Sequence, residues 1–93
     1  MGQFMHEAYE VIISDRAKKR LSKLPKTIGD DIVRKIYWLA ENADVIAHER
    51  LKGHREYSLH CGAYRIPYLL DRTNRVITIE DIGKHDEVYR RLR

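Results

Sequence analysis

Two amphipathic helical segments, separated by Pro25, take up most of the first half of the chain. In each segment the apolar residues recur every three or four positions, which places them on one face of a helix. Pro25 ends the first segment because proline lacks an amide hydrogen and restricts the residue before it. We therefore expect helices over residues 15–25 and 27–43, packed as an antiparallel hairpin because the turn between them is short. The two apolar stripes consist of Ala17, Leu21 and Leu24 in the first helix, and of Ile28, Ile32, Ile36, Leu39 and Ala43 in the second.

Short segments rich in β-branched and aromatic residues lie on both sides of this hairpin and predict strands. One precedes the helices, at residues 9–13, and three follow them, at 57–60, 64–70 and 76–82. The last three are separated only by short turns, so they should pair as an antiparallel meander. Pro67 cannot donate a ladder hydrogen bond, and we expect a local bulge or one missing bond at that position.

The chain has 93 residues, which is enough for one domain and too few for two independent cores. The expected fold is α+β: a four-stranded, mostly antiparallel twisted sheet with the helical hairpin packed on one face. The single domain spans residues 1–93, and residues 1–7 are expected to be either disordered or foreign to the natural chain. Residues 84–93 should form a short C-terminal helix or a tail.

The net charge of +4 is confined to the second half of the chain. Residues 1–49 hold eight basic and eight acidic side chains, whereas residues 50–93 hold ten basic and six acidic ones. A positive surface attracts polyanions, nucleic acid above all, by Coulomb attraction and counterion release. A solvated basic surface without a ligand is the alternative that charge alone leaves open.

Several classes of protein are excluded by what the sequence lacks. The single cysteine, Cys61, can form neither an internal disulfide nor a multi-cysteine zinc site. No apolar stretch approaches the ~20 residues that cross a bilayer, and the first residues lack the pattern of a signal peptide. We expect a cytoplasmic protein that has no membrane partner and needs no metal or other cofactor.

Three short motifs follow one another in the second half of the chain. They are Leu51-Lys52-Gly53, then Gly62-x-Tyr64-Arg65-Ile66-x-Tyr68, then Ile79-x-x-Ile82-Gly83-Lys84-His85-x-x-Val88-Tyr89. Each motif alone has little specificity, but their order and spacing together resemble the RelE/ParE superfamily of toxins from toxin–antitoxin pairs. The resemblance extends over about residues 9–91, and it implies the α+β fold expected above.

Membership of this superfamily would imply a partner and one of two activities. Its toxins are bound by a cognate antitoxin, which masks a basic site. RelE-like members cut mRNA in the ribosomal A site, whereas ParE-like members poison DNA gyrase on the same fold, so individual residues must decide between them. We expect a ribosome-dependent endoribonuclease whose partners are its antitoxin, the ribosome and mRNA. The alternatives are a ParE-like inhibitor that binds DNA gyrase without catalysis, and an attenuated member that still binds its antitoxin.

RNA cleavage without a metal needs a base for the ribose 2′-hydroxyl, an acid for the departing 5′-oxygen and fixed positive charge at the phosphate. His60 and His85 are expected to share the acid–base work, because an imidazole titrates near neutral pH. Tyr89 matches the near-terminal tyrosine that in RelE-like enzymes stacks on a base or assists proton transfer; a core tyrosine is the alternative. The residues expected to bind substrate are basic, namely Lys52, Arg55, Lys84, Arg90 and Arg91.

Arg65 is the main candidate for the positive charge. It matches the strand arginine of RelE-like nucleases, and its guanidinium can hold two phosphate oxygens at once. A structural ion pair with Glu80 or Asp81 is the alternative. Ser58 is the departure from the pattern, because RelE-like sequences offer basic residues at two alternate positions that here hold Ser58 and His60. One positive group is therefore missing, which leaves open whether nuclease activity is retained.

Two aromatic residues of the second helix, Tyr37 and Trp38, are expected to pack against the sheet rather than bind a ligand. An exposed Trp38 would instead indicate a protein interface. The lysines and arginines of the first helix are expected to form a solvated face, with ribosomal RNA or an acidic antitoxin segment as the alternative contact.

Overall fold

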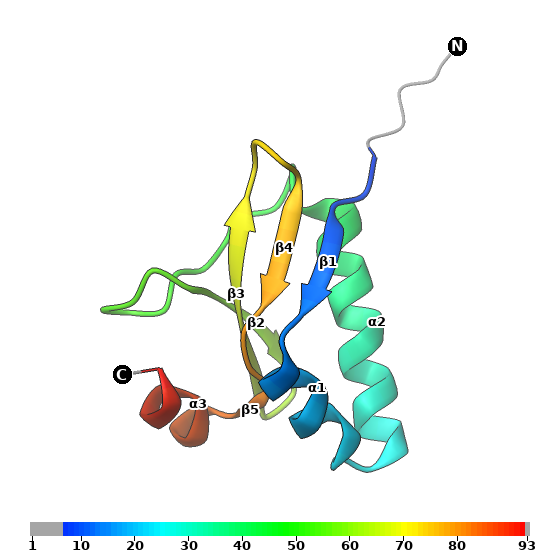
Figure 1. Ribbon diagram of the computed structural model, residues 1–93, viewed down its shortest axis with the longest axis vertical. Coiled ribbons are helices and arrows are strands. Elements are labelled where there is room, and N and C mark those ends of the chain that lie inside the picture. Colours follow the sequence, from blue (N-terminus) through cyan, green and yellow to red (C-terminus); the bar gives the residue numbers. More distant parts are fainter. Residues whose placement is uncertain (1–6, 93) are drawn as a thin grey trace.

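The computed structural model describes residues 7–92, which form three helices and a sheet (Figure 1). The expected properties of residues 1–6 and of Arg93 lie outside this described part. The elements in chain order are β1 (Glu10–Ile13), α1 (Asp15–Ser22), α2 (Lys26–Asn42), β2 (Tyr57–Cys61), β3 (Tyr64–Asp71), β4 (Val76–Ile79), β5 (Gly83–Lys84) and α3 (His85–Arg91).

The sheet has the strand order β1-β4-β3-β2, and β5 pairs with the beginning of β3. All pairs are antiparallel except β1 with β4, which run parallel. The predicted α+β fold is confirmed: a mostly antiparallel sheet with the two predicted helices, α1 and α2, packed on one face. The sheet has five strands instead of the predicted four, because Gly83 and Lys84 pair with Arg65 and Tyr64. A strand of two residues is too short to produce a periodic pattern in the sequence.

Helix α1 begins and ends near the predicted positions. The Ser14 hydroxyl accepts a hydrogen bond from the Ala17 amide at 3.1 Å, which caps the first turn. The helix ends at Ser22, three residues earlier than predicted, because the amides of Lys23 and Leu24 bond to carbonyls only three residues back. This tight last turn leads directly into Pro25 and the start of α2.

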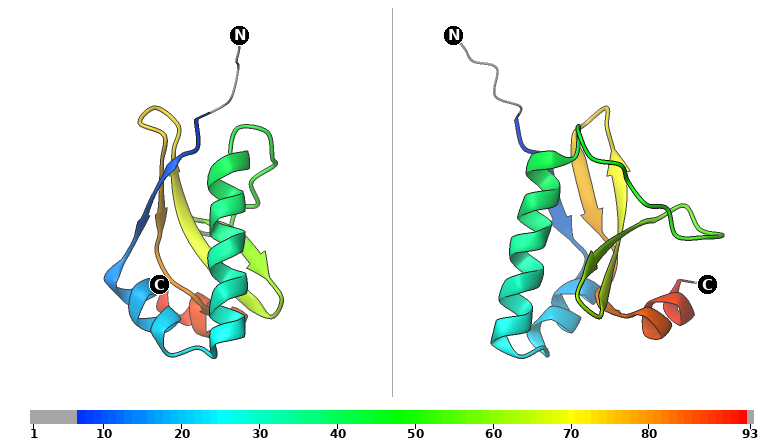
Figure 2. Two further views of the ribbon diagram at one scale, coloured as in Figure 1. Left: turned by 90° about the vertical axis from the view of Figure 1, so that its right-hand side faces the viewer. Right: turned by 180° about the vertical axis from the view of Figure 1, so that it is seen from behind.

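The core lies between α2 and one face of the sheet (Figure 2). Burying one large apolar side chain stabilises a fold by about 1.5–3 kcal/mol. The alternation of the strands directs every second residue of β3 and β4 toward the helix. The buried residues at this contact are Ile32, Ile36, Leu39 and Ala40 of α2, with Leu59, Ile66, Tyr68, Ile77 and Ile79 of the sheet.

The prediction that Tyr37 and Trp38 pack against the sheet is wrong. Tyr37 is 62% exposed and Trp38 is 41% exposed. Trp38 lies two positions beyond Ile36, about 200° around a helix of 3.6 residues per turn, so it points away from the apolar stripe. An indole on this side of α2 needs another explanation than packing in the core.

One ladder hydrogen bond is missing at Pro67, which is one of the two outcomes predicted for this position. Its carbonyl accepts a hydrogen bond from the Glu80 amide at 2.8 Å, but Pro67 has no amide hydrogen to return to Glu80. The Ser14 hydroxyl donates to the Glu80 carbonyl instead, at 2.8 Å. The pairing of β3 with β2 continues through Pro67 without a bulge, opposite Ser58.

The segment after β4 forms the short helix α3, which packs against β3 and β5. Val88 is the residue of α3 that is fully buried. Figure 2 shows α3 on the side of the sheet away from α2. Among residues 7–92, no helix combines the length and apolar composition needed to cross a membrane.

Candidate active site

A cavity of about 180 Å³ lies where the β2–β3 hairpin meets α3. All four residues predicted to be catalytic line it, namely His60, Arg65, His85 and Tyr89. The structure therefore brings together side chains from three elements that are separated by up to 29 positions in the sequence. Four further residues complete the lining, namely Glu49, Arg50, Leu51 and Ser58.

The register of the β2–β3 hairpin places His60 beside Arg65. The two residues are direct partners in the ladder, because the strands turn at Gly62. Gly62 has φ +59°, a conformation that glycine adopts without the steric cost of a side chain. Side chains alternate along a strand, so His60 and Arg65 lie on the opposite face from Leu59 and Ile66, which belong to the core.

Arg65 is held by main-chain carbonyls and not by a carboxylate. Its Nη1 donates to the carbonyls of Gly62 and Tyr64, each at 3.2 Å. The alternative pairing with Asp81 does not occur, because Asp81 pairs with Arg91 at 2.6 Å. No ion pair of Arg65 is found within residues 7–92, Glu80 included. The guanidinium can therefore offer its remaining donors to an anion in the cavity.

His60 has a carboxylate neighbour. Its Nε2 lies 3.3 Å from Oε1 of Glu49. Glu49 is fixed beside β2 because its carbonyl accepts a 2.7 Å hydrogen bond from the Ser58 amide. This pair could not be predicted from the sequence, since Glu49 lies in a connector without periodicity, eleven positions before the histidine.

Arg50 is a second arginine of the cavity that sequence reasoning missed. Its guanidinium lies 4.6 Å from the centre of the Tyr57 ring, and its Nη2 donates to the Tyr57 hydroxyl at 3.0 Å. Its Nη1 donates to the carbonyl of Arg55 at 2.9 Å, which closes the loop before β2. Arg50 thus adds a fixed positive charge to the wall of a cavity in which Ser58 carries none.

His85 and Tyr89 lie one turn apart on α3, with their ring centres 4.5 Å from each other. The His54 ring contacts Tyr89 as well, at 5.9 Å between ring centres. Tyr89 is half-buried between these rings and does not belong to the main core. His85 Nδ1 also lies 3.3 Å from a carboxylate oxygen of Asp86, the next residue.

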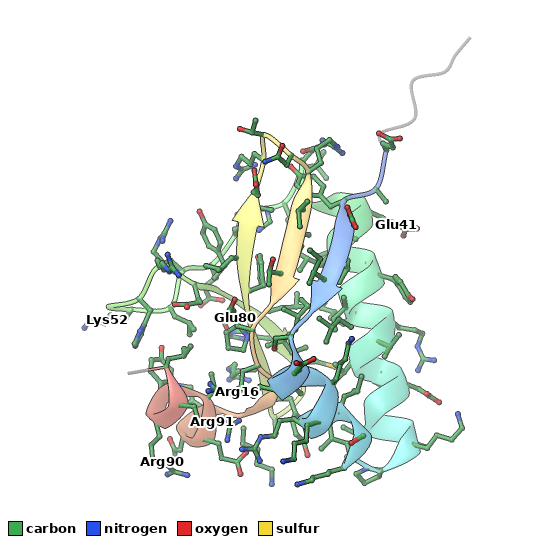
Figure 3. The ribbon with its side chains drawn as sticks, viewed as in Figure 1. Arg16, Glu41, Lys52, Glu80, Arg90 and Arg91 are labelled. Carbon is green, nitrogen blue, oxygen red and sulfur yellow. The ribbon has the colours of Figure 1, made fainter. Side chains whose placement is uncertain are left out.

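Arg91 has a structural role that its sequence position did not reveal. It forms an ion pair with Asp81, whose side chain has no exposed area. The predicted contact of Arg91 with substrate stays a prediction, and it would have to use the part of the guanidinium that this pair leaves free. Arg90, Lys52 and Arg55 are exposed; Figure 3 marks Lys52 on the protruding loop before β2 and Arg90 on the outer side of α3.

Lys84 lies outside the cavity. Together with Arg20 and Lys23 it lines a separate groove of about 180 Å³ between α1 and the start of α3. Its amide donates to the Glu87 carboxylate at 3.0 Å, and this bond lowers the pKa of Glu87. The predicted substrate contact of Lys84 would therefore have to occur beside the cavity and not within it.

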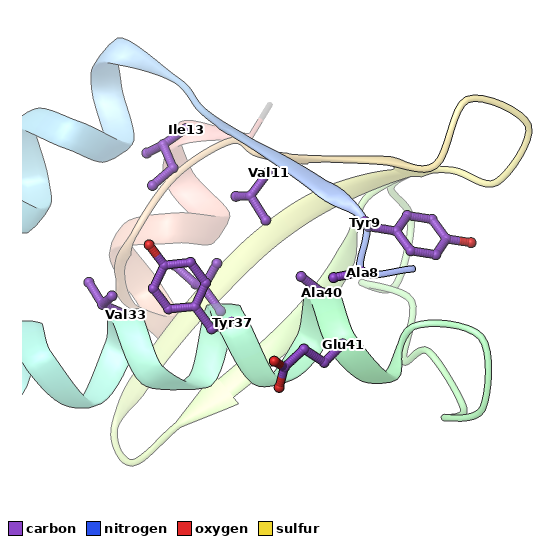
Figure 4. A pocket seen from close by; sticks show the side chains of 9 residues that line it. Ala8, Tyr9, Val11, Ile13, Val33, Tyr37, Ala40 and Glu41 are labelled. Carbon is purple, nitrogen blue, oxygen red and sulfur yellow. The ribbon is translucent and has the colours of Figure 1, made fainter. Parts of the chain in front are cut away.

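A larger groove, about 330 Å³, lies between β1 and α2 (Figure 4). Its lining is mostly apolar and includes Val11, Ile13, Val33 and Tyr37. None of the residues predicted to be catalytic lines it. Residues 7–92 also contain no group of three or more His, Cys, Asp or Glu side chains that could hold a metal ion.

Comparison with known families gives a match over most of the chain. The family model for the ParE toxin of the type II toxin–antitoxin system parDE matches residues 11–89. The chain belongs to the ParE toxin family. It is thus a toxin of a toxin–antitoxin system, of the RelE/ParE type. None of the curated protein sequences matched this toxin.

Solved structures of RelE toxins share the fold of this toxin. A mutant of Escherichia coli RelE in the free state has a TM-score of 0.75 and 25% identity, over 92% of this chain and 95% of that one. The RelE–RelB complex of Pyrococcus horikoshii matches with a TM-score of 0.68 and 25% identity, over 84% and 96%. The toxin–antitoxin complex RelBE2 of Mycobacterium tuberculosis matches with a TM-score of 0.71 and 23% identity, over 85% and 100%.

Proposed function

We propose that this toxin is an endoribonuclease that cuts mRNA in the ribosomal A site by attack of the ribose 2′-hydroxyl on the adjacent phosphate. The observation that carries the proposal is the shared cavity, which joins Arg65 to two histidines and a tyrosine. These are the residue types that supply charge stabilisation and proton transfer to such a reaction. A protein that only binds gyrase has no need for them in one cavity.

Each step of the reaction has a candidate group. His60 accepts the proton of the 2′-hydroxyl, and the Glu49 carboxylate orients the imidazole and balances the positive charge it acquires. His85, which lines the cavity from α3, gives a proton to the departing 5′-oxygen. Arg65 and Arg50 stabilise the charge on the phosphoryl oxygens. The bond from phosphorus to the 5′-oxygen breaks as the bond from the 2′-oxygen forms, and no step calls for a metal.

The test is primer extension on a defined mRNA incubated with the purified toxin, with and without programmed ribosomes. We expect cuts at A-site codons only when ribosomes are present. Arg65→Ala should lower the cleavage rate by roughly 100-fold or more, the usual effect of removing one donor that stabilises a transition state. Arg72→Ala is the matched control, since Arg72 is exposed in the turn between β3 and β4 and does not line the cavity. Equal cleavage by the Arg65 and Arg72 variants would contradict the assignment.

Inhibition of DNA gyrase is the second candidate function. Two points favour it: the matching family model is that of a ParE toxin, and Ser58 stands at a position where the resemblance to RelE-like nucleases implies a basic residue. Purified toxin would then block supercoiling by gyrase while RNA stays intact on programmed ribosomes. In cells, DNA damage would precede any loss of protein synthesis, whereas an endoribonuclease stops protein synthesis first.

An antitoxin encoded with the toxin is the expected partner. Several of the similar solved structures are complexes of a RelE toxin with a RelB antitoxin. Addition of the antitoxin should suppress the cleavage seen by primer extension. A toxin that binds its antitoxin tightly but acts on neither ribosomes nor gyrase would be an attenuated member of the family.

A further inference from the structure

A second groove, about 270 Å³, adjoins the candidate active site at the outer edge of β2. It shares Glu49, Ser58 and His60 with the catalytic cavity, so the two hollows meet along these residues. Lys35 and Trp38 of α2 form its far wall. An RNA strand bound in the cavity can therefore extend into this groove without leaving the surface of the protein.

Trp38 gives the groove an aromatic surface that the core does not use. The indole is 41% exposed, and the Lys35 ammonium lies 4.3 Å from its ring centre. Such a pair fixes the ring by a cation–π contact and adds positive charge beside it. Unpaired nucleotides are bound by proteins in this way, with the base stacked on an aromatic side chain and the strand drawn in by nearby cations.

Two polar residues of the groove can form hydrogen bonds with a base. Ser58 is 7% exposed, and its hydroxyl is a buried polar atom without a hydrogen-bond partner within residues 7–92. Glu49 lies at the junction with the cavity, with a side chain that is 69% exposed. Its carboxylate can accept hydrogen bonds from the amino group of a base. Leu59 and Tyr68 form an apolar floor. The apolar face of a base can pack against such a surface.

We infer that this groove is a subsite for the base of an unpaired nucleotide next to the cleaved bond, with Trp38 as its stacking surface. The inference rests on the proposed ribonuclease function, because it assigns a part of the substrate to that site. Trp38 then acts as a specificity-determining residue and not as a catalytic one. The groove would influence which codons are cut, while Arg65 and the histidines determine how fast the bond breaks.

The experiment compares Trp38→Leu and Trp38→Phe with the unchanged toxin on programmed ribosomes, measuring kcat, KM and the set of codons that are cut. Trp38→Leu should raise KM roughly ten-fold, the loss of one base stack, and alter the cut codons while kcat stays near its original value. Trp38→Phe should retain most of the affinity because it keeps an aromatic face. Tyr37→Ala is the matched control, an exposed aromatic on the same helix outside the groove. An unchanged KM and an unchanged set of codons in Trp38→Leu would overturn the inference.

The failure of the proposed function can be told apart from the failure of this subsite. If the unchanged toxin cuts no RNA, the endoribonuclease proposal fails, and RNA binding is then measured by the fluorescence of Trp38, the single tryptophan of the chain. The probe is a short single-stranded RNA with 2′-O-methyl groups, which cannot be cleaved by 2′-hydroxyl attack. Saturable quenching would support the subsite, and no quenching would overturn it. Loss of antitoxin affinity in Trp38→Leu without an effect on RNA would also overturn it, and would assign this surface to the protein partner.

Discussion

Asp81 is a fully buried carboxylate, and its two oxygens are used differently. Oδ1 accepts a 2.8 Å hydrogen bond from the Ile82 amide, and Oδ2 pairs with Nε of Arg91 at 2.6 Å. A Cβ on Gly83 would lie 2.5 Å from Nη2 of Arg91, so a side chain at position 83 would displace the guanidinium from its present position. The glycine of the closing motif therefore allows the arginine to reach the buried charge, which fastens α3 to the sheet.

Arg91→Ala should destabilise the toxin by about 3–5 kcal/mol, because it leaves the Asp81 charge buried without a partner. The measurement is the free energy of unfolding from urea denaturation. Arg90→Ala is the matched control, and we expect it to change this free energy by less than about 0.5 kcal/mol because Arg90 is exposed. Similar losses in the two variants would show that the ion pair contributes nothing beyond an ordinary surface charge.

At the scale of elements, Ser14 joins two parts of the fold with one hydroxyl. It accepts from the Ala17 amide at the start of α1 and donates to the Glu80 carbonyl beyond β4. The second bond occupies the acceptor that Pro67 leaves without a donor. The side chain thus caps a helix and completes the end of a strand pair at the same time.

Ser14→Ala should lower the free energy of unfolding by about 1–2 kcal/mol, the upper part of the range for a lost helix cap, because a carbonyl also loses its donor. Ser22→Ala serves as the control, since its hydroxyl only donates to the exposed Lys19 carbonyl at the end of the same helix. Thermal unfolding of both variants measures the difference. An effect of Ser14→Ala no larger than that of Ser22→Ala would refute this account.

The sequence was informative about elements with a regular period and silent about those without one. The apolar stripe of α2 and the alternation of β3 predict both the core and the face on which Arg65 lies. The aromatic character of Trp38 suggests burial, but its position off the apolar stripe of α2 leaves it 41% exposed. Glu49 and Arg50 were missed because only the folded connector brings them to the cavity, through pairing with β2.

At the scale of the whole molecule, two buried tyrosines should make the folded toxin less stable at alkaline pH. Burial raises the pKa of Tyr68, whose hydroxyl lies 2.5 Å from Nδ1 of His48. Burial and the hydrogen bond to Asp44 raise the pKa of Tyr9, which directly precedes the edge strand β1. A pKa raised in the folded state means that the contribution of these phenols to stability is complete below about pH 10, the pKa of an unfolded tyrosine, and is lost as the pH rises further.

The unchanged toxin should therefore lose thermal stability as the pH rises from about 10 to about 12, and Tyr68→Phe should lose less over the same interval because it has one buried phenol fewer. The readout is the slope of Tm against pH, since the variant also lacks the bond to His48 and starts from a lower Tm. Tyr37→Phe, which changes an exposed tyrosine, should follow the slope of the unchanged toxin. Parallel slopes for all three proteins would contradict the prediction.

Alternate residues of strand β3 face opposite sides of the sheet and have different roles. Ile66 and Tyr68 face α2 and belong to the core, whereas Arg65 faces the cavity from the other side of the same strand. The two faces of the strand therefore contact different surroundings, the core on one side and the cavity on the other. In evolutionary terms, the residues that face the cavity can change one at a time, and with them the cellular target of the toxin. The residues that face the core stay under separate selection for folding.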